Sequence, residues 1–128
     1  MSSGAARAPR TARFDAFAAG DLAAVRELSR PDAVWHAQRL GLLGGDHEGW
    51  PAVAAFFDRT MELTNGSFSV TIEDVLTDDS SVAAVARSRG ERDGRRLDDR
   101  QVHLFRLENG LVAEVWQFPG EDTVAFWS

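Results

Sequence analysis

Four polar side chains in the last third of the chain have the types and spacing for proton-transfer chemistry: Asp99, Gln101, His103 and Glu114. The imidazole of His103 has an ordinary pKa of about 6.5, so it can give or take a proton at neutral pH. A carboxyl group placed among aromatic rings has its pKa raised by loss of hydration. Glu114 could then orient His103 or act as acid or base itself. We therefore predict His103, Glu114 and Asp99 as catalytic residues.

Two tight turns define the strands that carry these residues. Asp93-Gly94 and Asn109-Gly110 are strong hairpin signals, because a type I′ turn requires φ > 0 at both central residues. Counting outward from each turn gives a register for the flanking strands. The predicted opposite pairs are Arg92–Arg95, Ser88–Asp99, Ala86–Gln101, Ala84–His103 and Val82–Phe105 in the first hairpin, and Leu107–Val112, Phe105–Glu114, His103–Trp116 and Gln101–Phe118 in the second.

This register predicts one largely apolar sheet face that includes the four polar residues, because side chains alternate along a strand. Its expected members are Val82, Ala84, Ala86, Ser88, Leu97, Asp99, Gln101, His103, Phe105, Leu107, Val112, Glu114, Trp116 and Phe118. Polar groups on such a face cost free energy unless they are paired or hydrogen-bonded. The face is therefore either a self-satisfied buried network or the wall of a cavity.

The rest of the chain predicts helices that cover this face. Proline, glycine and N-cap signals favour helices over 9–19, 21–28 and 51–63, and strands over 33–37 and 67–76. Residues 38–49 read as a glycine-rich loop whose leucines fold over something apolar, and the tail after Pro119 should dock on the body through its aromatic residues. Helices gathered before a run of antiparallel strands predict an α+β fold, in which a cone-shaped curved antiparallel sheet packs on three N-terminal helices.

The interior of such a cone is the expected ligand site. Aromatic rings give a large contact area for flat apolar ligands. The alternation of the strand around Trp35 places that ring toward the cavity and His36 on the opposite face, unless a bulge turns it inward. The predicted substrate-binding residues are Trp35, Gln101, Trp116, Phe57, Phe105 and His36, with Asp99 and Gln101 nearest the open end and orienting the substrate.

Composition narrows the function further. The 128 residues carry a formal net charge of −6 and no cysteine, and no stretch is long and apolar enough to span a membrane. We expect residues 1–8 to be a flexible N-terminus and 9–128 to be one domain, in a cytoplasmic protein that binds neither nucleic acid nor membrane.

The arginines of the second sheet face are expected to pair with Glu91 and Asp98 across strands. The three histidines lack metal-ligand spacing, and no phosphate-binding glycine loop precedes a helix, so neither metal nor other cofactor is expected.

The chain resembles the nuclear transport factor 2-like superfamily, in particular its SnoaL-like branch of polyketide cyclases and ketosteroid isomerase-related proteins. The resemblance covers nearly the whole chain and is carried by the segments Gly20-Asp21-Leu22-Ala23-Ala24-Val25, Asp32-Ala33-Val34-Trp35-His36, Val53-Ala54-Ala55-Phe56-Phe57, Glu91-Arg92-Asp93-Gly94-Arg95, Val102-His103-Leu104-Phe105-Arg106-Leu107 and Asn109-Gly110 with Glu114-Val115-Trp116. It implies a cystatin-like cone and a homodimer formed through the outer sheet face. The oxyanion-hole acid of ketosteroid isomerases falls at His103, whereas their general-base position falls at about Ala37 and their tyrosine has no counterpart.

Two functions fit these observations. The first is a cofactor-free enzyme that isomerises, cyclises or dehydrates an apolar polyketide- or terpenoid-like substrate by acid/base proton transfer. The second is a non-catalytic small-ligand-binding or dimerisation module of the same fold, in which the polar residues form a satisfied network.

Overall fold

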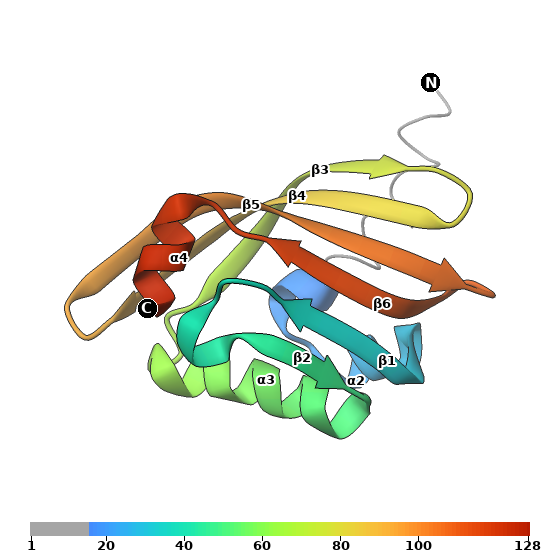
Figure 1. Ribbon diagram of the computed structural model, residues 1–128, viewed down its shortest axis with the longest axis horizontal. Helices are drawn as coiled ribbons and strands as arrows, with labels where there is room; N and C mark the ends of the chain where they lie inside the picture. The colour runs from blue at the N-terminus through green and yellow to red at the C-terminus, as the bar shows by residue number, and fades with distance from the viewer. Residues whose placement is uncertain (1–15) are drawn as a thin grey trace.

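A computed structural model describes residues 16–128, which form one curved six-stranded sheet with helices on one side (Figure 1). The predicted flexible segment 1–8 and most of the predicted helix 9–19 lie outside the described residues; residues 16–19 are helical. The elements that follow are α2 (Leu22–Leu28), β1 (Ser29–Ala37), the short 3-10 helix η1 (Gly41–Leu43), β2 (Gly45–Glu48), α3 (Trp50–Leu63), β3 (Ser69–Thr77), β4 (Ser81–Arg92), β5 (Arg95–Glu108), β6 (Leu111–Phe118) and α4 (Glu121–Trp127).

The strand order across the sheet is β2-β1-β6-β5-β4-β3. All neighbouring pairs are antiparallel except β1 and β6, which run parallel. The predicted α+β class with a curved sheet is confirmed. Several elements differ from expectation. The glycine-rich segment holds η1 and the edge strand β2, β1 begins at Ser29 instead of residue 33, and the C-terminal tail is the helix α4.

Both predicted hairpin turns are present. Asp93 and Gly94 have φ of 50° and 77°, and Asn109 and Gly110 have φ of 52° and 81°, as a type I′ turn requires. In the first hairpin the register agrees with all five predicted pairs, among them Ala84 opposite His103. The first hairpin therefore follows from its turn residues alone.

The second hairpin follows its predicted register only next to the turn. Leu107 lies opposite Val112, but the next pair is Arg106 with Glu114, so one extra residue, Ala113, is inserted into β6. Such a β-bulge moves every later side chain of the strand to the other face. The predicted positions of Glu114 and Trp116 beside His103 are therefore wrong, and the residue opposite His103 is Gln117.

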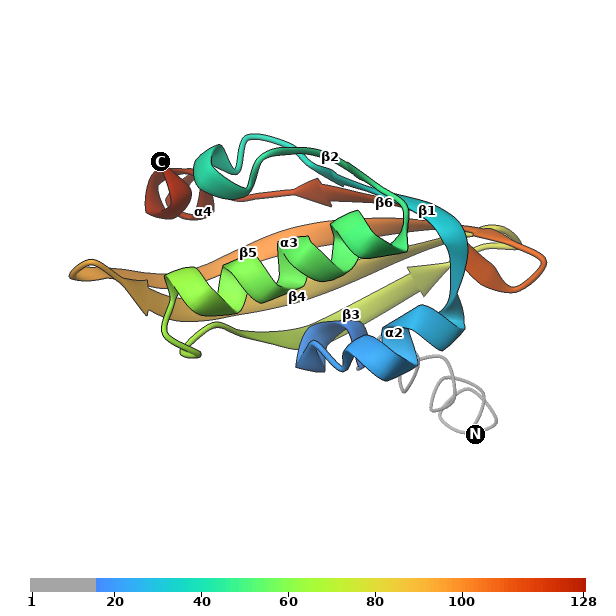
Figure 2. The same cartoon turned by 90° about the horizontal axis from the view of Figure 1, so that it is seen from below.

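Helices α2 and α3 lie over the concave face of the sheet (Figure 2). Asp21 caps α2 as predicted, its carboxylate accepting a hydrogen bond from the Ala24 amide at 3.2 Å. Helix α3 buries Val53, Phe56 and Thr60 against the sheet, at the helical period. The core thus lies between α3 and the inner sheet face.

Helix α4 packs on the far end of the long hairpin β4–β5, seen at the left of Figure 1. Asp99 anchors the first turn of α4: its carboxylate accepts hydrogen bonds from the backbone N–H and the hydroxyl of Thr123 at 2.9 and 2.7 Å. The buried guanidinium of Arg92 donates to the carbonyl of Phe126 at the other end. Both predicted aromatic anchors of the tail, Phe126 and Trp127, are buried.

Candidate active site

A cavity of about 90 Å³ lies between the inner sheet face and α3. A water molecule needs roughly 10–15 Å³ on this measure, so the cavity has room for a small organic group. Its walls are mostly apolar and aromatic, with one polar side built by the sheet. The lining residues are Phe17, Ala18, Ala19, Gly20, Trp35, Leu40, Leu43, Phe56, Phe57, Thr60, Met61, Phe68, Val70, Gln101, His103, Gln117, Thr123 and Trp127.

The cavity reaches the surface beside Met61. That side chain lines the cavity and is 43% exposed, and Ala19 and Gly20, which also line the cavity, are exposed residues. The entrance therefore lies between α3 and the segment that leads into α2. Leu40 and Leu43 line the apolar side of the cavity, as predicted for the leucines of the glycine-rich loop 38–49. Leu42 is exposed.

His103 is the titratable side chain of this cavity among residues 16–128. Strand β5 points it inward, where its ring meets the rings of Trp35 and Phe105 edge-on at centroid distances of 6.0 and 6.3 Å. Burial lowers the pKa of His103 to about 4, because a charged imidazolium would lose its hydration among these rings. At neutral pH the ring is therefore uncharged.

A chain of buried hydrogen bonds reaches His103 through the side chain of Gln117. The indole nitrogen of Trp35 donates to Gln117 Oε1 at 2.7 Å, and Gln117 Nε2 lies 3.3 Å from Gln101 Oε1 and 3.4 Å from His103 Nε2. Gln101 Nε2 in turn donates to the hydroxyl of Ser88. In the described part of the chain, no fully buried side-chain nitrogen or oxygen is left without a partner. The polar wall is thus both a satisfied network and a cavity lining.

The structure brings only part of the predicted site together. His103, Gln101, Trp35 and Phe57 line the cavity as expected. Phe105 is on the same face, but it lies in the core beneath His103 and does not line the cavity. Asp99 also lies on this face, but its carboxylate accepts both hydrogen bonds from Thr123. Thr123 belongs to α4, whereas only a docking tail was predicted there.

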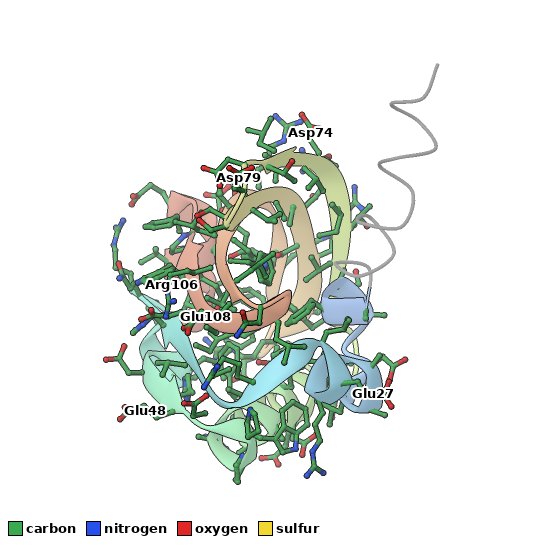
Figure 3. All side chains as sticks on the ribbon, turned by 90° about the vertical axis from the view of Figure 1, so that its right-hand side faces the viewer. Glu27, Glu48, Asp74, Asp79, Arg106 and Glu108 are labelled. Atoms are coloured by element: carbon green, nitrogen blue, oxygen red, sulfur yellow. The ribbon has the colours of Figure 1, made fainter. Side chains whose placement is uncertain are left out.

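The remaining predicted residues, His36, Glu114 and Trp116, form a separate cluster on the outer sheet face. His36 Nε2 is 2.5 Å from Glu114 Oε2, and His36 Nδ1 is 2.7 Å from Asp46 Oδ1. The ring of Trp116 stacks on His36 at a centroid distance of 5.3 Å. Arg106, labelled in Figure 3 beside Glu108 and ion-paired with it, also donates to Glu114 Oε1 at 3.1 Å.

Electrostatics in this outer cluster differ from those in the cavity. Partial burial works to lower the pKa of His36, but Asp46 and Glu114 outweigh it, so the pKa is raised. Burial works to raise the pKa of Glu114, but hydrogen bonds and charge from His36 and Arg106 outweigh it, so the pKa is lowered. Glu114 is therefore a paired carboxylate, and its predicted role as the partner of His103 is wrong because the two lie on opposite faces.

Gln117 was not predicted as a site residue, although it occupies the place beside His103 at which Trp116 was expected. A signal was present: Val112 and Val115 are both apolar yet three residues apart, so an unbroken strand cannot bury both. The bulge at Ala113 resolves this conflict, and both valines are buried.

The described residues also limit the chemistry. Within 16–128, no aspartate, glutamate, lysine or arginine lines the cavity, and no group of three or more histidine or acidic residues is arranged to hold a metal ion. The predicted cross-strand pairing of the outer arginines is confirmed for Arg87 and Arg89, which both contact Asp98. None of the described helices has the length and apolar character needed to cross a membrane.

Known proteins are similar to this chain in sequence and in structure. The model of the SnoaL-like domain matches residues 11–115. An uncharacterised protein of Mycobacterium tuberculosis is 34% identical over 118 residues, which is 90% of each chain. The structure of Bal32a, from a soil-derived mobile gene cassette, superposes with a TM-score of 0.84 at 30% identity and covers 92% of both chains.

A more distant neighbour shares the fold alone. TerC, co-crystallised with polyporic acid, has a TM-score of 0.76 at 18% identity, over 91% of this chain and 90% of its own. The family model, by contrast, matches more than half of the sequence. This chain therefore belongs to the SnoaL-like family.

Proposed function

We propose that this protein is an enzyme that isomerises, cyclises or dehydrates a small, largely apolar organic compound bound in the cavity, with His103 as the catalytic residue that contacts the reacting group. The observation that carries the proposal is that His103 is the one titratable side chain that residues 16–128 contribute to an apolar, aromatic cavity open to solvent.

The lowered pKa of His103 restricts its role. An uncharged imidazole cannot act as a general acid at neutral pH, because it carries no extra proton to give. It can still accept a proton or donate a hydrogen bond to a substrate oxygen. Stabilising charge at an oxygen in a water-poor site is a large catalytic effect, typically of about 10²–10³-fold for one donor.

Exchange of carbon-bound hydrogen with solvent tests the enzyme proposal without knowing the natural substrate. A panel of cyclic ketones and β-diketones is incubated with the protein in D₂O, and loss of the proton next to the carbonyl group is followed by ¹H NMR. We expect the wild-type chain to accelerate exchange for some members and His103→Gln to lose about 10²-fold or more of that rate. Asp46→Asn, on the outer sheet face, should leave the rate unchanged.

A specific observation favours a second function, that of a non-catalytic binding protein. Among the described residues the cavity lacks a carboxylate, the commonest partner of a proton-transfer histidine. The exchange experiment separates the two functions. Ketones that shift the His103 resonances but gain no exchange would contradict the enzyme proposal and support the binding module.

We further propose that the outer sheet face pairs with a second copy of the chain. Leu76 and Phe118 on this face are 61% and 46% exposed, and Val102, Leu104 and Trp116 are only partly buried. The charged side chains around them are already paired within the chain, which leaves an apolar centre that a copy of itself can cover. Light scattering should give twice the chain mass of 14.0 kDa, and Leu104→Glu should return the mass to that of one chain.

A further inference from the structure

The chain of hydrogen bonds beside His103 has a fixed donor-to-acceptor direction, because its first member, Trp35, can only donate. An indole nitrogen carries a hydrogen and has no lone pair to offer, so the 2.7 Å contact from Trp35 requires the oxygen of the Gln117 side chain to face it. The Gln117 amide nitrogen must then face the other way. Trp35 and Gln117 are both buried, which leaves water little access to compete for these groups.

The fixed orientation of the Gln117 amide makes its nitrogen the donor to two other partners. Its Nε2 carries two hydrogens, and its neighbours are Gln101 Oε1 at 3.3 Å and His103 Nε2 at 3.4 Å. A donor on Gln117 requires an acceptor on the imidazole, so Nε2 of His103 bears a lone pair. The proton of the uncharged ring therefore sits on Nδ1.

The second ring nitrogen of His103 is the one available to a ligand. Nδ1 makes no hydrogen bond to any residue in the range 16–128. No fully buried side-chain nitrogen in that range lacks a partner, so Nδ1 is not fully buried. Since His103 lines the cavity, its Nδ1–H is open to that space. An occupant that brings an oxygen to Nδ1 would complete the hydrogen bonding of the ring.

We propose that Trp35 and Gln117 are positioning residues that hold His103 as the Nδ1–H tautomer, so that it donates a hydrogen bond to the carbonyl oxygen of an uncharged ligand. In this arrangement His103 acts as a hydrogen-bond donor and not as a base, because its lone pair on Nε2 faces Gln117. A proton that leaves a carbon atom of the ligand then passes to solvent water. The ligand-class part of the inference rests on the proposed function of the cavity; the tautomer part stands on the buried network alone.

The walls of the cavity select for an uncharged ligand. A carboxylate or ammonium group entering it would lose its hydration, and none of the lining residues within 16–128 carries an opposite charge. A carbonyl group loses less hydration and gains a hydrogen bond that the low-dielectric surroundings strengthen. We therefore assign neutral ketones, quinones or lactones as the ligand class, in preference to organic acids.

The tautomer is measured directly by long-range ¹H–¹⁵N correlation spectra of the uniformly ¹⁵N-labelled protein at pH 7, with the His103 signals identified by their loss in His103→Gln. We expect Nε2 to resonate as an unprotonated ring nitrogen and Nδ1 as a protonated one. A protonated Nε2 would overturn the proposal. This measurement needs no substitution in the network.

Two substitutions then test what holds the tautomer. Trp35→Phe keeps an aromatic wall but removes the indole N–H, so the Gln117 amide can rotate and both tautomers of His103 should appear. Gln117→Met removes the donor itself and should have the same effect if the first variant does not fold. Trp116→Phe, on the outer face, is the matched control and should leave the tautomer unchanged. Unchanged spectra in both network variants would contradict the positioning role.

A pair of ligands of similar shape tests the ligand class. Acetophenone carries a neutral carbonyl group and benzoate a charged carboxylate on the same ring. We expect acetophenone to shift the His103 Nδ1–H signal and benzoate to bind at least tenfold more weakly. Equal binding would refute the preference for uncharged ligands. If neither compound bound while the tautomer was as expected, the proposed function would fail and the positioning role would stand.

Discussion

The two faces of the sheet give the same residue type opposite properties. His103 on the inner face has amide and aromatic neighbours, and burial lowers its pKa to about 4. His36 on the outer face lies between the carboxylates of Asp46 and Glu114, and its pKa is raised. The two rings are carried by different strands of one sheet, separated only by β6.

The difference shows that the partners of a histidine, together with its burial, decide its charge. A carboxylate stabilises the imidazolium form by direct attraction, whereas an amide nitrogen that donates to the ring stabilises the uncharged form. The one-residue bulge at Ala113 directs Glu114 to His36 and Gln117 to His103. A single inserted residue in β6 therefore separates a histidine that is paired with carboxylates from a histidine that is buried and uncharged.

The largest expected consequence is an acid-side loss of stability that comes from His103. Its folded pKa of about 4 lies below the unfolded value of about 6.5, so between these values the unfolded chain binds a proton that the folded chain does not. The contribution is fully present above pH 6.5 and is lost as the pH falls through 4, which amounts to about 3 kcal/mol. Urea unfolding at a series of pH values measures it.

His36 should act in the opposite direction. Because its folded pKa is raised, its stabilising contribution is fully present below the unfolded pKa and is lost as the pH rises through the folded value. His103→Gln should flatten the acid side of the pH–stability curve, and His36→Gln should flatten only the region above the unfolded pKa. If His103→Gln left the slope between pH 6.5 and 4 unchanged, the cavity would not hold an uncharged buried ring.

The fold was largely predictable because its signals are local. Asp93-Gly94 and Asn109-Gly110 specify two hairpins through the positive φ values that their turns require, and the register of β4 with β5 follows for the whole length of the pair. Asp21 likewise begins α2 as predicted. Helix α4 was not predicted, because its position depends on Asp99 and Arg92, which are distant in sequence.

The candidate site was predictable only up to the bulge. His103 and Gln101 belong to β5, whose inward face follows from the first turn, and both line the cavity. Glu114 and Trp116 lie beyond Ala113 in β6, so the same counting places them on the wrong face. The bulge at Ala113 allows both Val112 and Val115 to pack in the core. The residues of the Asn109-Gly110 turn carry no information about this packing.

The contrast between the faces can be removed by one substitution, Gln117→Glu. It puts a carboxyl group at the place where the amide nitrogen now meets His103 Nε2, and so gives the inner histidine the kind of partner that His36 has. An opposite charge at this distance raises the pKa of a histidine by about 1–3 units, although burial of the introduced carboxyl group works against its ionisation. We expect the pKa of His103, followed by NMR titration of its ring, to rise from about 4 toward its ordinary value.

Gln117→Met provides the control for this titration, because it removes the amide without adding charge. The pKa of His103 should stay low in that variant, since burial alone keeps it there. A rise in both variants would mean that the amide network, and not desolvation, depresses the pKa. No rise in Gln117→Glu would mean that the introduced carboxyl group stays protonated among the aromatic rings, and that burial on the inner face outweighs the partner effect seen at His36.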